Sequence, residues 1–250
     1  MSHPPHITNE RLAFPGGEGA EVRGELLKPE SAPPLPGVVL LHDRYGLTDH
    51  VRDTARRLAA QDYAVLAVDL FSRDEDVQQF PPTREQSRNM SRFPDERTTR
   101  DVQGALAHMR TRKDVDPGRI ALVGFSFGAR YGLLTAGIGE DVAALVVFYP
   151  VIVYPQLHES RPRQPLSLIP SIKCPVMTIY GEKDWMAPLS QVTFMESLLH
   201  GHGKVHECVR YPDQGHGFFN STIKQYNEAI AKDSFDKMLV FLSQHVKGKR

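Results

Sequence analysis

Ser126 lies in a Gly-x-Ser-x-Gly pattern between an apolar run and a helix-compatible stretch. This context is typical of a nucleophile elbow, the sharp strand-to-helix turn that exposes a catalytic serine at the end of a buried strand. The backbone at such a turn is strained and needs small neighbours, which Gly124 and Gly128 provide. Taken alone, the motif also fits an ordinary strand-to-helix turn in a nucleotide-binding fold, so its meaning depends on the rest of the chain.

A serine hydroxyl is a weak nucleophile at neutral pH, so it needs a base and an acid that orients the base. In folds with this elbow, the acid and the histidine follow the serine in chain order, each after a later strand. Asp184 comes shortly after the apolar run 174–180, and His216 lies in a glycine-flanked loop after the alternating run 205–211. The sequence therefore predicts a triad of Ser126, Asp184 and His216.

Two other groups of residues could take part in chemistry. Asp213 lies in the same loop as His216 and is the rival acid, although aspartates in loops readily bond nearby backbone N–H groups and shape the turn. His200, His202 and His206 are close in sequence, but no cysteine or carboxylate stands beside them at a recognised metal-ligand spacing. We therefore expect a solvated loop there, and neither a metal nor an organic cofactor.

Acyl transfer also needs two hydrogen-bond donors for the oxyanion. One is the backbone N–H of Phe127, directly after the nucleophile. The other is expected in the loop after the first buried strand, where residues 42–46 read His-Asp-Arg-Tyr-Gly, and we predict the backbone N–H of Arg44. Loss of one such donor typically costs on the order of 3 kcal/mol in the transition state. A surface ion pair between Asp43 and Arg44 is the alternative interpretation of this segment.

The composition fits an enzyme that acts on a small molecule. The 250 residues include 30 Lys plus Arg and 30 Asp plus Glu, and the formal net charge is zero. This balance does not indicate binding to nucleic acid or to an anionic membrane, which usually involves an excess of positive charge. No stretch could span a bilayer and the N-terminus lacks secretory features, so we expect a cytoplasmic protein. The length fits one domain over residues 1–250, which we expect to be a monomer or homodimer.

The hydrophobic pattern indicates an α/β fold. Residues 7–14 and 21–28 are predicted to form an antiparallel hairpin, and the proline-rich residues 29–36 a rigid connector. Strands follow at 37–41, 64–69, 120–123, 143–148, 176–180 and 205–211, with helices near 50–61, 98–112, 188–200 and 224–246. Repeated βα units imply a mostly parallel central sheet with helices on both faces. Residues 71–94 and 149–171 interrupt the pattern and are expected to wall the pocket near the serine.

Together the motifs resemble the dienelactone hydrolase family of α/β-hydrolases. The resemblance covers nearly the whole chain from residue 37 onward. It rests on Leu-His-Asp-Arg-Tyr-Gly at 41–46, Val-Asp-Leu-Phe at 68–71, Gly-Phe-Ser-Phe-Gly at 124–128, Gly-Glu-Lys-Asp at 181–184 and Gly-His-Gly-Phe at 215–218. The resemblance implies the α/β-hydrolase fold and the same triad that the residues themselves predict.

Two departures from the family pattern affect the expected reaction. The best-known members use a cysteine nucleophile controlled by a glutamate, whereas this chain has Ser126 and the shorter Asp43, so no thiolate switch is expected. Those members also hold a substrate carboxylate with two arginines. Either Arg84 or Arg88 matches the first, but the second position is Asn220. With this clamp incomplete, we expect a preference for neutral esters, and a shift toward anionic lactones when an arginine replaces the asparagine.

The predicted function is hydrolysis of a small carboxylic ester or lactone through an acyl-enzyme. Dienelactone hydrolysis proper (carboxymethylenebutenolidase activity) is one alternative, and a peptidase of the same fold, which usually carries a gating domain, is another. A non-catalytic hydrolase-like binding protein would be expected to have a broken triad. Candidate substrate-binding residues stand on the expected strand-end loops: Asp43, Tyr45, Arg84, Arg88, Trp185 and Phe218, with Phe71, Phe127 and Tyr149 as further aromatic candidates.

Overall fold

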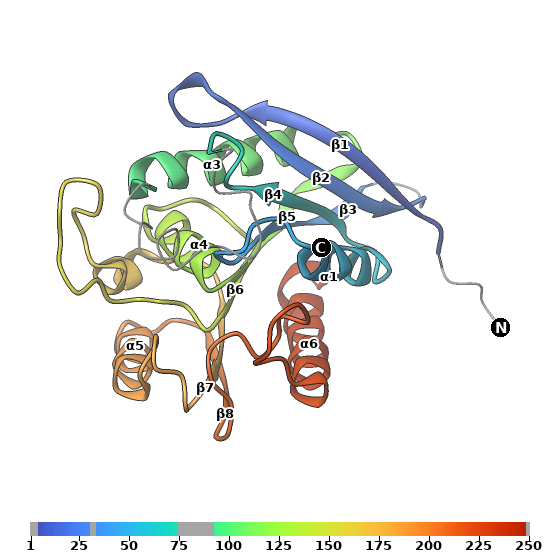
Figure 1. Ribbon diagram of the computed structural model, residues 1–250. Helices are drawn as coiled ribbons and strands as arrows, with labels where there is room; N and C mark the ends of the chain where they lie inside the picture. The colour runs from blue at the N-terminus through green and yellow to red at the C-terminus, as the bar shows by residue number, and fades with distance from the viewer. Residues whose placement is uncertain (1–4, 31–33, 75–92, 249–250) are drawn as a thin grey trace.

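Figure 1 shows the protein as a computed structural model, in which helices flank a central sheet. The structure describes residues 5–30, 34–74 and 93–248. The described elements are β1 (Ile7–Pro15), η1 (Gly17–Gly19), β2 (Glu21–Pro29), β3 (Leu35–Leu41), α1 (Asp49–Ala59), β4 (Ala64–Asp69), α3 (Asp95–Thr111), β5 (Val115–Phe125), α4 (Phe127–Gly137), β6 (Ala144–Phe148), η4 (Pro165–Ser171), β7 (Val176–Gly181), α5 (Leu189–Gly201), β8 (His206–Tyr211), α6 (Glu228–Leu242) and η5 (Ser243–Lys247).

The described strands form one sheet in the order β1-β2-β4-β3-β5-β6-β7-β8. The β1–β2 and β2–β4 pairs are antiparallel, and the other neighbouring pairs are parallel. The predicted α/β fold, with a mostly parallel sheet and an N-terminal antiparallel hairpin, is therefore confirmed. The C-terminal ends of parallel strands share one edge of a sheet, which is where α/β proteins bind their ligands. The loops after β3, β5, β7 and β8 bring the predicted site residues to that edge.

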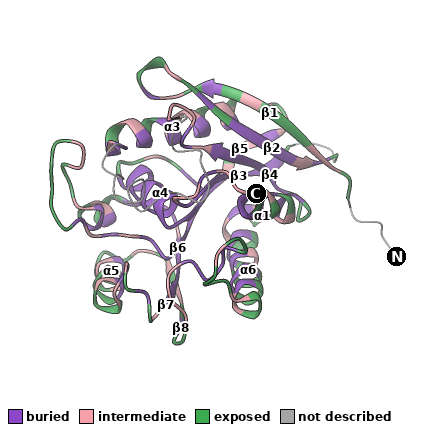
Figure 2. Ribbon diagram, in the orientation of Figure 1, coloured by how far each residue is buried: buried purple, intermediate pink, exposed green. Residues whose placement is uncertain are grey.

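Two apolar cores lie on opposite faces of the sheet. Helices α3, α4 and α5 cover one face and contribute residues such as Val102, Leu133 and Met195, whereas α1 and α6 cover the other with residues such as Leu58 and Phe241. Figure 2 shows the central strands as mostly buried, and every residue of β3, β6 and β7 is buried. Strands covered on both faces are almost continuously apolar, and burying each large aliphatic side chain contributes roughly 1.5–3 kcal/mol.

The structure differs from the predicted elements mainly at their ends. β3 and β5 both begin earlier than predicted, because Leu35 pairs with Val115 across a register shift. Helix α6 begins later than predicted, since Asn227 caps it by accepting the Ile230 N–H. Among the described helices, none has the length and apolar character needed to cross a membrane.

Candidate active site

Ser126 occupies the turn between β5 and α4, with φ +48° and ψ −102°. A non-glycine residue at positive φ is strained, and such strain is concentrated at functional sites. The turn is also tight. A Cβ on Gly124 would lie 2.7 Å from backbone atoms of Ala129, and one on Gly128 would lie 2.5 Å from the carbonyl oxygen of His42. Both glycines are therefore required by close packing of the backbone, and the turn has the form of a nucleophile elbow.

The three predicted triad residues lie together at the C-terminal edge of the sheet. Ser126 Oγ is 2.7 Å from His216 Nε2, and His216 Nδ1 is 2.7 Å from Asp184 Oδ2. When Nδ1–H donates to the carboxylate, Nε2 is left to accept the serine proton. The second carboxylate oxygen accepts the backbone N–H groups of Met186 and Ala187 at 2.8 and 3.1 Å. The loop thus fixes the carboxylate, and the carboxylate orients the ring.

The loop that carries the acid is bound to the loop that carries the histidine. The Lys183 N–H donates to the carbonyl of Gln214 at 2.9 Å. Asp213, the rival acid, points elsewhere: its side chain is 82% exposed and lies 2.8 Å from Lys183 Nζ. The geometry therefore pairs His216 with Asp184 and leaves Asp213 on the surface.

The two predicted oxyanion donors lie in the turn after β5 and in the loop after β3. Phe127 is the first residue of α4, where helical N–H groups have no partner within the helix. Arg44 lies in the loop after β3, and the next amide, that of Tyr45, already donates to Asp43 Oδ1 at 2.9 Å. Among the hydrogen bonds of the described residues, the amides of Phe127 and Arg44 have no acceptor. Both are therefore available to a substrate oxygen.

His42 holds the loop after β3 in place, a role that sequence analysis did not assign. The ring is fully buried; Nδ1 donates to the Asp43 carbonyl at 2.6 Å, and Nε2 accepts the Leu70 N–H at 3.0 Å. Its own carbonyl accepts the Gly128 N–H of the elbow at 3.0 Å. Burial lowers the pKa of His42, which keeps the ring neutral, as one donor and one acceptor nitrogen require. His42 thus joins the ends of β3 and β4 to the elbow.

Asp43 lines the cavity beside the nucleophile, and burial raises the pKa of its carboxyl group. Its two oxygens accept hydrogen bonds from the Tyr45 N–H at 2.9 Å and from Asn220 Nδ2 at 2.7 Å. Among the ion pairs of the described residues, none joins Arg44 to Asp43. Instead, the guanidinium donates to the Tyr45 hydroxyl at 2.9 Å and lies 4.9 Å from that ring's centre. The alternative of a surface ion pair is therefore wrong.

Asn220, which stands where the family has its second arginine, does not face the cavity. The residue is fully buried, and its Oδ1 accepts hydrogen bonds from the N–H and the hydroxyl of Thr222 at 2.9 and 2.6 Å. Together with its bond to Asp43, these contacts brace the loop after β3 against the loop after His216. The burial of Asn220 and its internal hydrogen bonds argue against the expectation that an arginine at this position would recognise an anion.

A cavity of about 230 Å³ lies at Ser126 and His216. The predicted residues Asp43, Arg44, Tyr45, Tyr149 and Trp185 line it. Gly215 and Gly217 also line it, and sequence analysis missed three further side chains, which stand in the loops after Asp184 and His216: Met186, Ile223 and Gln225. Their position downstream of a catalytic candidate is the one signal in the sequence that could have found them.

The aromatic candidates divide between the cavity and the core. Trp185 is 79% exposed at the cavity rim. Phe218, by contrast, is fully buried and packs against Tyr149 and Tyr211 at 5.4 Å between ring centres. The prediction that Phe218 binds substrate is therefore wrong, because the chain turns inward at Gly217, where φ is +82°.

The remaining candidates lie elsewhere. Phe127 is buried in the core and contributes its backbone rather than its ring. Phe71 is buried too, at the wall of a second cavity. Arg84 and Arg88 lie outside the described residues.

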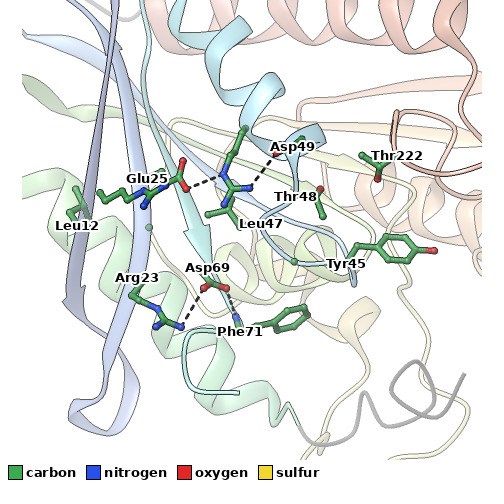
Figure 3. A pocket seen from close by; sticks show the side chains of 14 residues that line it. Leu12, Arg23, Glu25, Tyr45, Leu47, Thr48, Asp49, Asp69, Phe71 and Thr222 are labelled. Atoms are coloured by element: carbon green, nitrogen blue, oxygen red, sulfur yellow. Dashed lines mark hydrogen bonds and ion pairs between the residues drawn. The ribbon is translucent and has the colours of Figure 1, made fainter. Parts of the chain in front are cut away.

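That second cavity, of about 690 Å³, lies between the β1–β2 hairpin and the loop after β3. Figure 3 shows Arg23 directed toward Asp69, at 3.8 Å, and Arg52 Nε lies 3.0 Å from Glu25. Tyr45 lines this cavity and also the cavity at Ser126, so its side chain forms part of a common wall.

The histidines near the end of α5 are not grouped as metal ligands. Within residues 5–30, 34–74 and 93–248, no three His, Cys, Asp or Glu side chains are grouped to hold an ion. His200 and His202 are exposed, and His206 Nε2 lies 3.3 Å from Thr178 Oγ1.

Several known proteins are similar to this chain. The model of the dienelactone hydrolase family matches residues 22–246. A curated protein of Salmonella typhimurium, named "Putative carboxymethylenebutenolidase", is 31% identical over 84% of this chain and 78% of its own length. The crystal structure of a "Putative Dienelactone Hydrolase" from Klebsiella pneumoniae matches 96% of this chain and 99% of its own, with a TM-score of 0.88 and 26% identity. An acylaminoacyl peptidase of Pyrococcus horikoshii shares the fold at a TM-score of 0.77 and 15% identity, and 42% of that chain is covered.

Proposed function

Because the chain belongs to the dienelactone hydrolase family, we propose that it cleaves a small carboxylic ester or lactone through an acyl-enzyme formed on Ser126. The observation that carries the proposal is the continuous line of hydrogen bonds from Ser126 through His216 to Asp184, beside a cavity. A hydrolase-like protein that only binds its ligand would be expected to lack part of this line. The geometry therefore favours an enzyme.

The proposed reaction has two steps. In the first, Ser126 Oγ attacks the carbonyl carbon while His216 Nε2 takes its proton, and Asp184 stabilises the imidazolium that results. The amides of Phe127 and Arg44 bind the oxyanion, and the imidazolium then gives its proton to the leaving alcohol. In the second step His216 activates a water molecule that releases the acid. These steps use side chains and amides of this chain and require no cofactor.

We propose neutral esters as the preferred substrates. Among the described residues that line the catalytic cavity, Arg44 is the only cation, and its guanidinium is bound to Tyr45. Asp43 places a carboxyl group in the same cavity, which disfavours an anion. Dienelactone hydrolysis proper remains the second candidate, because curated relatives carry the name carboxymethylenebutenolidase. Comparing kcat/KM for a neutral aryl ester with that for an anionic lactone of similar size distinguishes the two.

Covalent labelling tests the nucleophile. A fluorophosphonate should modify the purified protein at Ser126, located by peptide mass spectrometry. Ser126→Ala should abolish labelling and lower ester turnover by about a million-fold, since triad members act as a unit. Ser197→Ala, a change of an exposed serine on α5, is the matched control and should label normally. Near-normal turnover by a pure Ser126→Ala sample would remove this serine from the mechanism.

A further inference from the structure

Tyr149 follows β6 and lines the catalytic cavity, yet it belongs neither to the triad nor to the oxyanion hole. Its side chain is fully buried, and its hydroxyl has no hydrogen-bond partner among the described residues. Buried hydroxyl groups normally have partners, because burying one without a partner is destabilising. At a cavity wall, the missing acceptor can be an atom of the substrate.

The backbone and the ring of Tyr149 are both fixed. The residue has φ +37°, which is strained for a bulky side chain, and its N–H donates to the Ile179 carbonyl at 2.7 Å. The ring packs edge-on against His216, with 4.9 Å between centres and 62° between planes, and Phe218 supports it from the core. Tyr149 and Ser126 are thus two strained residues at the ends of neighbouring strands, the kind of strain that is concentrated at active sites.

From the order of the strands we infer which part of a bound ester would lie near Tyr149. Strand β5, which leads into Ser126, lies between β3 and β6 (Figure 1). The proposed oxyanion donor Arg44 follows β3, so the carbonyl oxygen lies on that side of the nucleophile. Tyr149 follows β6 on the other side, where its ring contacts His216. The leaving-group oxygen must reach His216 Nε2 to be protonated, and it therefore lies on the Tyr149 side.

The hydroxyl of Tyr149 remains protonated in this setting. Burial, together with the carboxylates of Asp43 and Asp184, raises the pKa of Tyr149 well above its ordinary value. The group can therefore donate a hydrogen bond without giving up its proton. A fixed donor of this kind stabilises charge that develops in a transition state.

We propose that the Tyr149 hydroxyl donates a hydrogen bond to the leaving-group oxygen of the ester, beside the N–H of His216. When the bond from carbon to this oxygen breaks, the electron pair goes to the oxygen and the proton comes from His216. Tyr149 keeps its own proton and stabilises the partial negative charge. The inference rests on the proposed serine hydrolase function and adds a substrate class: unactivated alkyl esters and aliphatic lactones, whose leaving oxygens are the most basic.

A series of esters with one acyl group and leaving groups of rising pKa, from p-nitrophenol to ethanol, tests this role in Tyr149→Phe. An ester with a good leaving group needs little help, so its kcat/KM should fall by no more than about threefold. For the ethyl ester, loss of the donor should lower kcat/KM by about 10- to 100-fold. The slope of log kcat/KM against leaving-group pKa should therefore become steeper. Tm should not fall, because the hydroxyl that is removed has no partner in the described protein.

Tyr63→Phe is the matched control. Tyr63 is also buried, and within the described part of the chain its hydroxyl has no partner either, but it does not line the catalytic cavity. This change should leave the slope as it is. For Tyr149→Phe, an equal loss with every leaving group, a fall in Tm that accounts for the loss, or no loss at all would each overturn the inference. A parent protein that hydrolyses none of the esters and takes no fluorophosphonate would instead remove the proposed function, and this inference with it.

Discussion

The Asp184 carboxylate accepts three hydrogen bonds, two from backbone amides and one from His216. Asp184→Asn would place an amide where the imidazole needs an acceptor, and the ring would lose its productive tautomer. We expect kcat for a p-nitrophenyl ester to fall by about ten-thousand-fold. Asp213→Asn, in the same loop as the histidine, should change kcat by less than about twofold, because exposed ion pairs contribute little. The opposite ranking would make Asp213 the orienting acid.

Asn220→Ala tests the brace between the two loops. The change removes the donor to Asp43 and the acceptor for Thr222, so we expect the free energy of unfolding to fall by about 2 kcal/mol or more in urea titrations. Gln61→Ala, an exposed change after α1, should stay within about 0.5 kcal/mol. Because position 220 faces the core, the kcat/KM ratio of neutral to anionic esters should not change. A clear change in that ratio would show that the position contacts substrate.

At the scale of residues, the sequence predicts the groups whose spacing follows from the chemistry. Ser126, Asp184 and His216 are recognisable because the elbow motif, the chain order and the strand ends all point to them. The hydrogen bond between Asp43 and Asn220 is not recognisable, since it joins residues far apart in the chain that share no motif. The inward turn of Phe218 likewise depends on packing that becomes visible in the folded protein.

At the scale of elements, the loop after β3 separates two cavities, and Tyr45 forms part of the wall. Tyr45→Ala should open the catalytic cavity of about 230 Å³ toward the larger one of about 690 Å³. Along a series of p-nitrophenyl esters from acetate to decanoate, we expect the kcat/KM ratio of long to short esters to rise by about tenfold, because each newly buried methylene contributes about 0.8 kcal/mol. Tyr226→Ala, a change outside both cavities, is the control. An unchanged ratio would mean that Tyr45 does not limit substrate length.

The apolar strands are the elements that sequence predicts best, because burial on both faces leaves an unbroken run such as Val-Val-Leu-Leu in β3. Their starting points are less visible. β5 begins at Val115 because that residue pairs with Leu35, and no local pattern shows this pairing. Helix α6 starts at a cap formed by Asn227, and the sequence alone does not show which of the two asparagines in the region, Asn220 or Asn227, forms it.

At the scale of the whole molecule, repeated βα units predict a parallel sheet, but they do not fix its strand order. The hairpin joins the sheet by pairing β2 with β4, while β3, the next strand in the chain, lies between β4 and β5. The rule that crossovers between parallel strands are right-handed is compatible with this strand order and with other orders. The loops after β3, β5 and β6 become neighbours through that order, which is why the roles of Asp43 and Tyr149 follow from the fold rather than from a motif.

At this scale we expect the stability of the molecule to depend on pH through His50. This histidine of α1 is buried, with the rings of Phe125 and Phe219 edge-on at 5.2 and 5.5 Å. Burial lowers the pKa of His50 from 6.5 to about 4. Between these two values the unfolded chain binds a proton that the folded chain does not bind. The free energy of unfolding therefore has its full value above pH 6.5 and falls as the pH drops toward 4.

His50→Gln should remove this contribution, because glutamine does not titrate. A pKa lowered to about 4 corresponds to a loss of about 2 kcal/mol between pH 7 and pH 5, measured as the free energy of unfolding in urea. Between pH 7 and pH 5, the free energy of unfolding of the variant should therefore fall by about 2 kcal/mol less than that of the parent protein. This holds even if the variant is less stable at pH 7 because glutamine packs less well. His200→Gln, a change of an exposed histidine, should keep the pH dependence of the parent. If His50→Gln also kept the pH dependence of the parent, the acid sensitivity would have to come from other buried groups. His42, whose pKa is lowered by burial, would then be the next residue to replace.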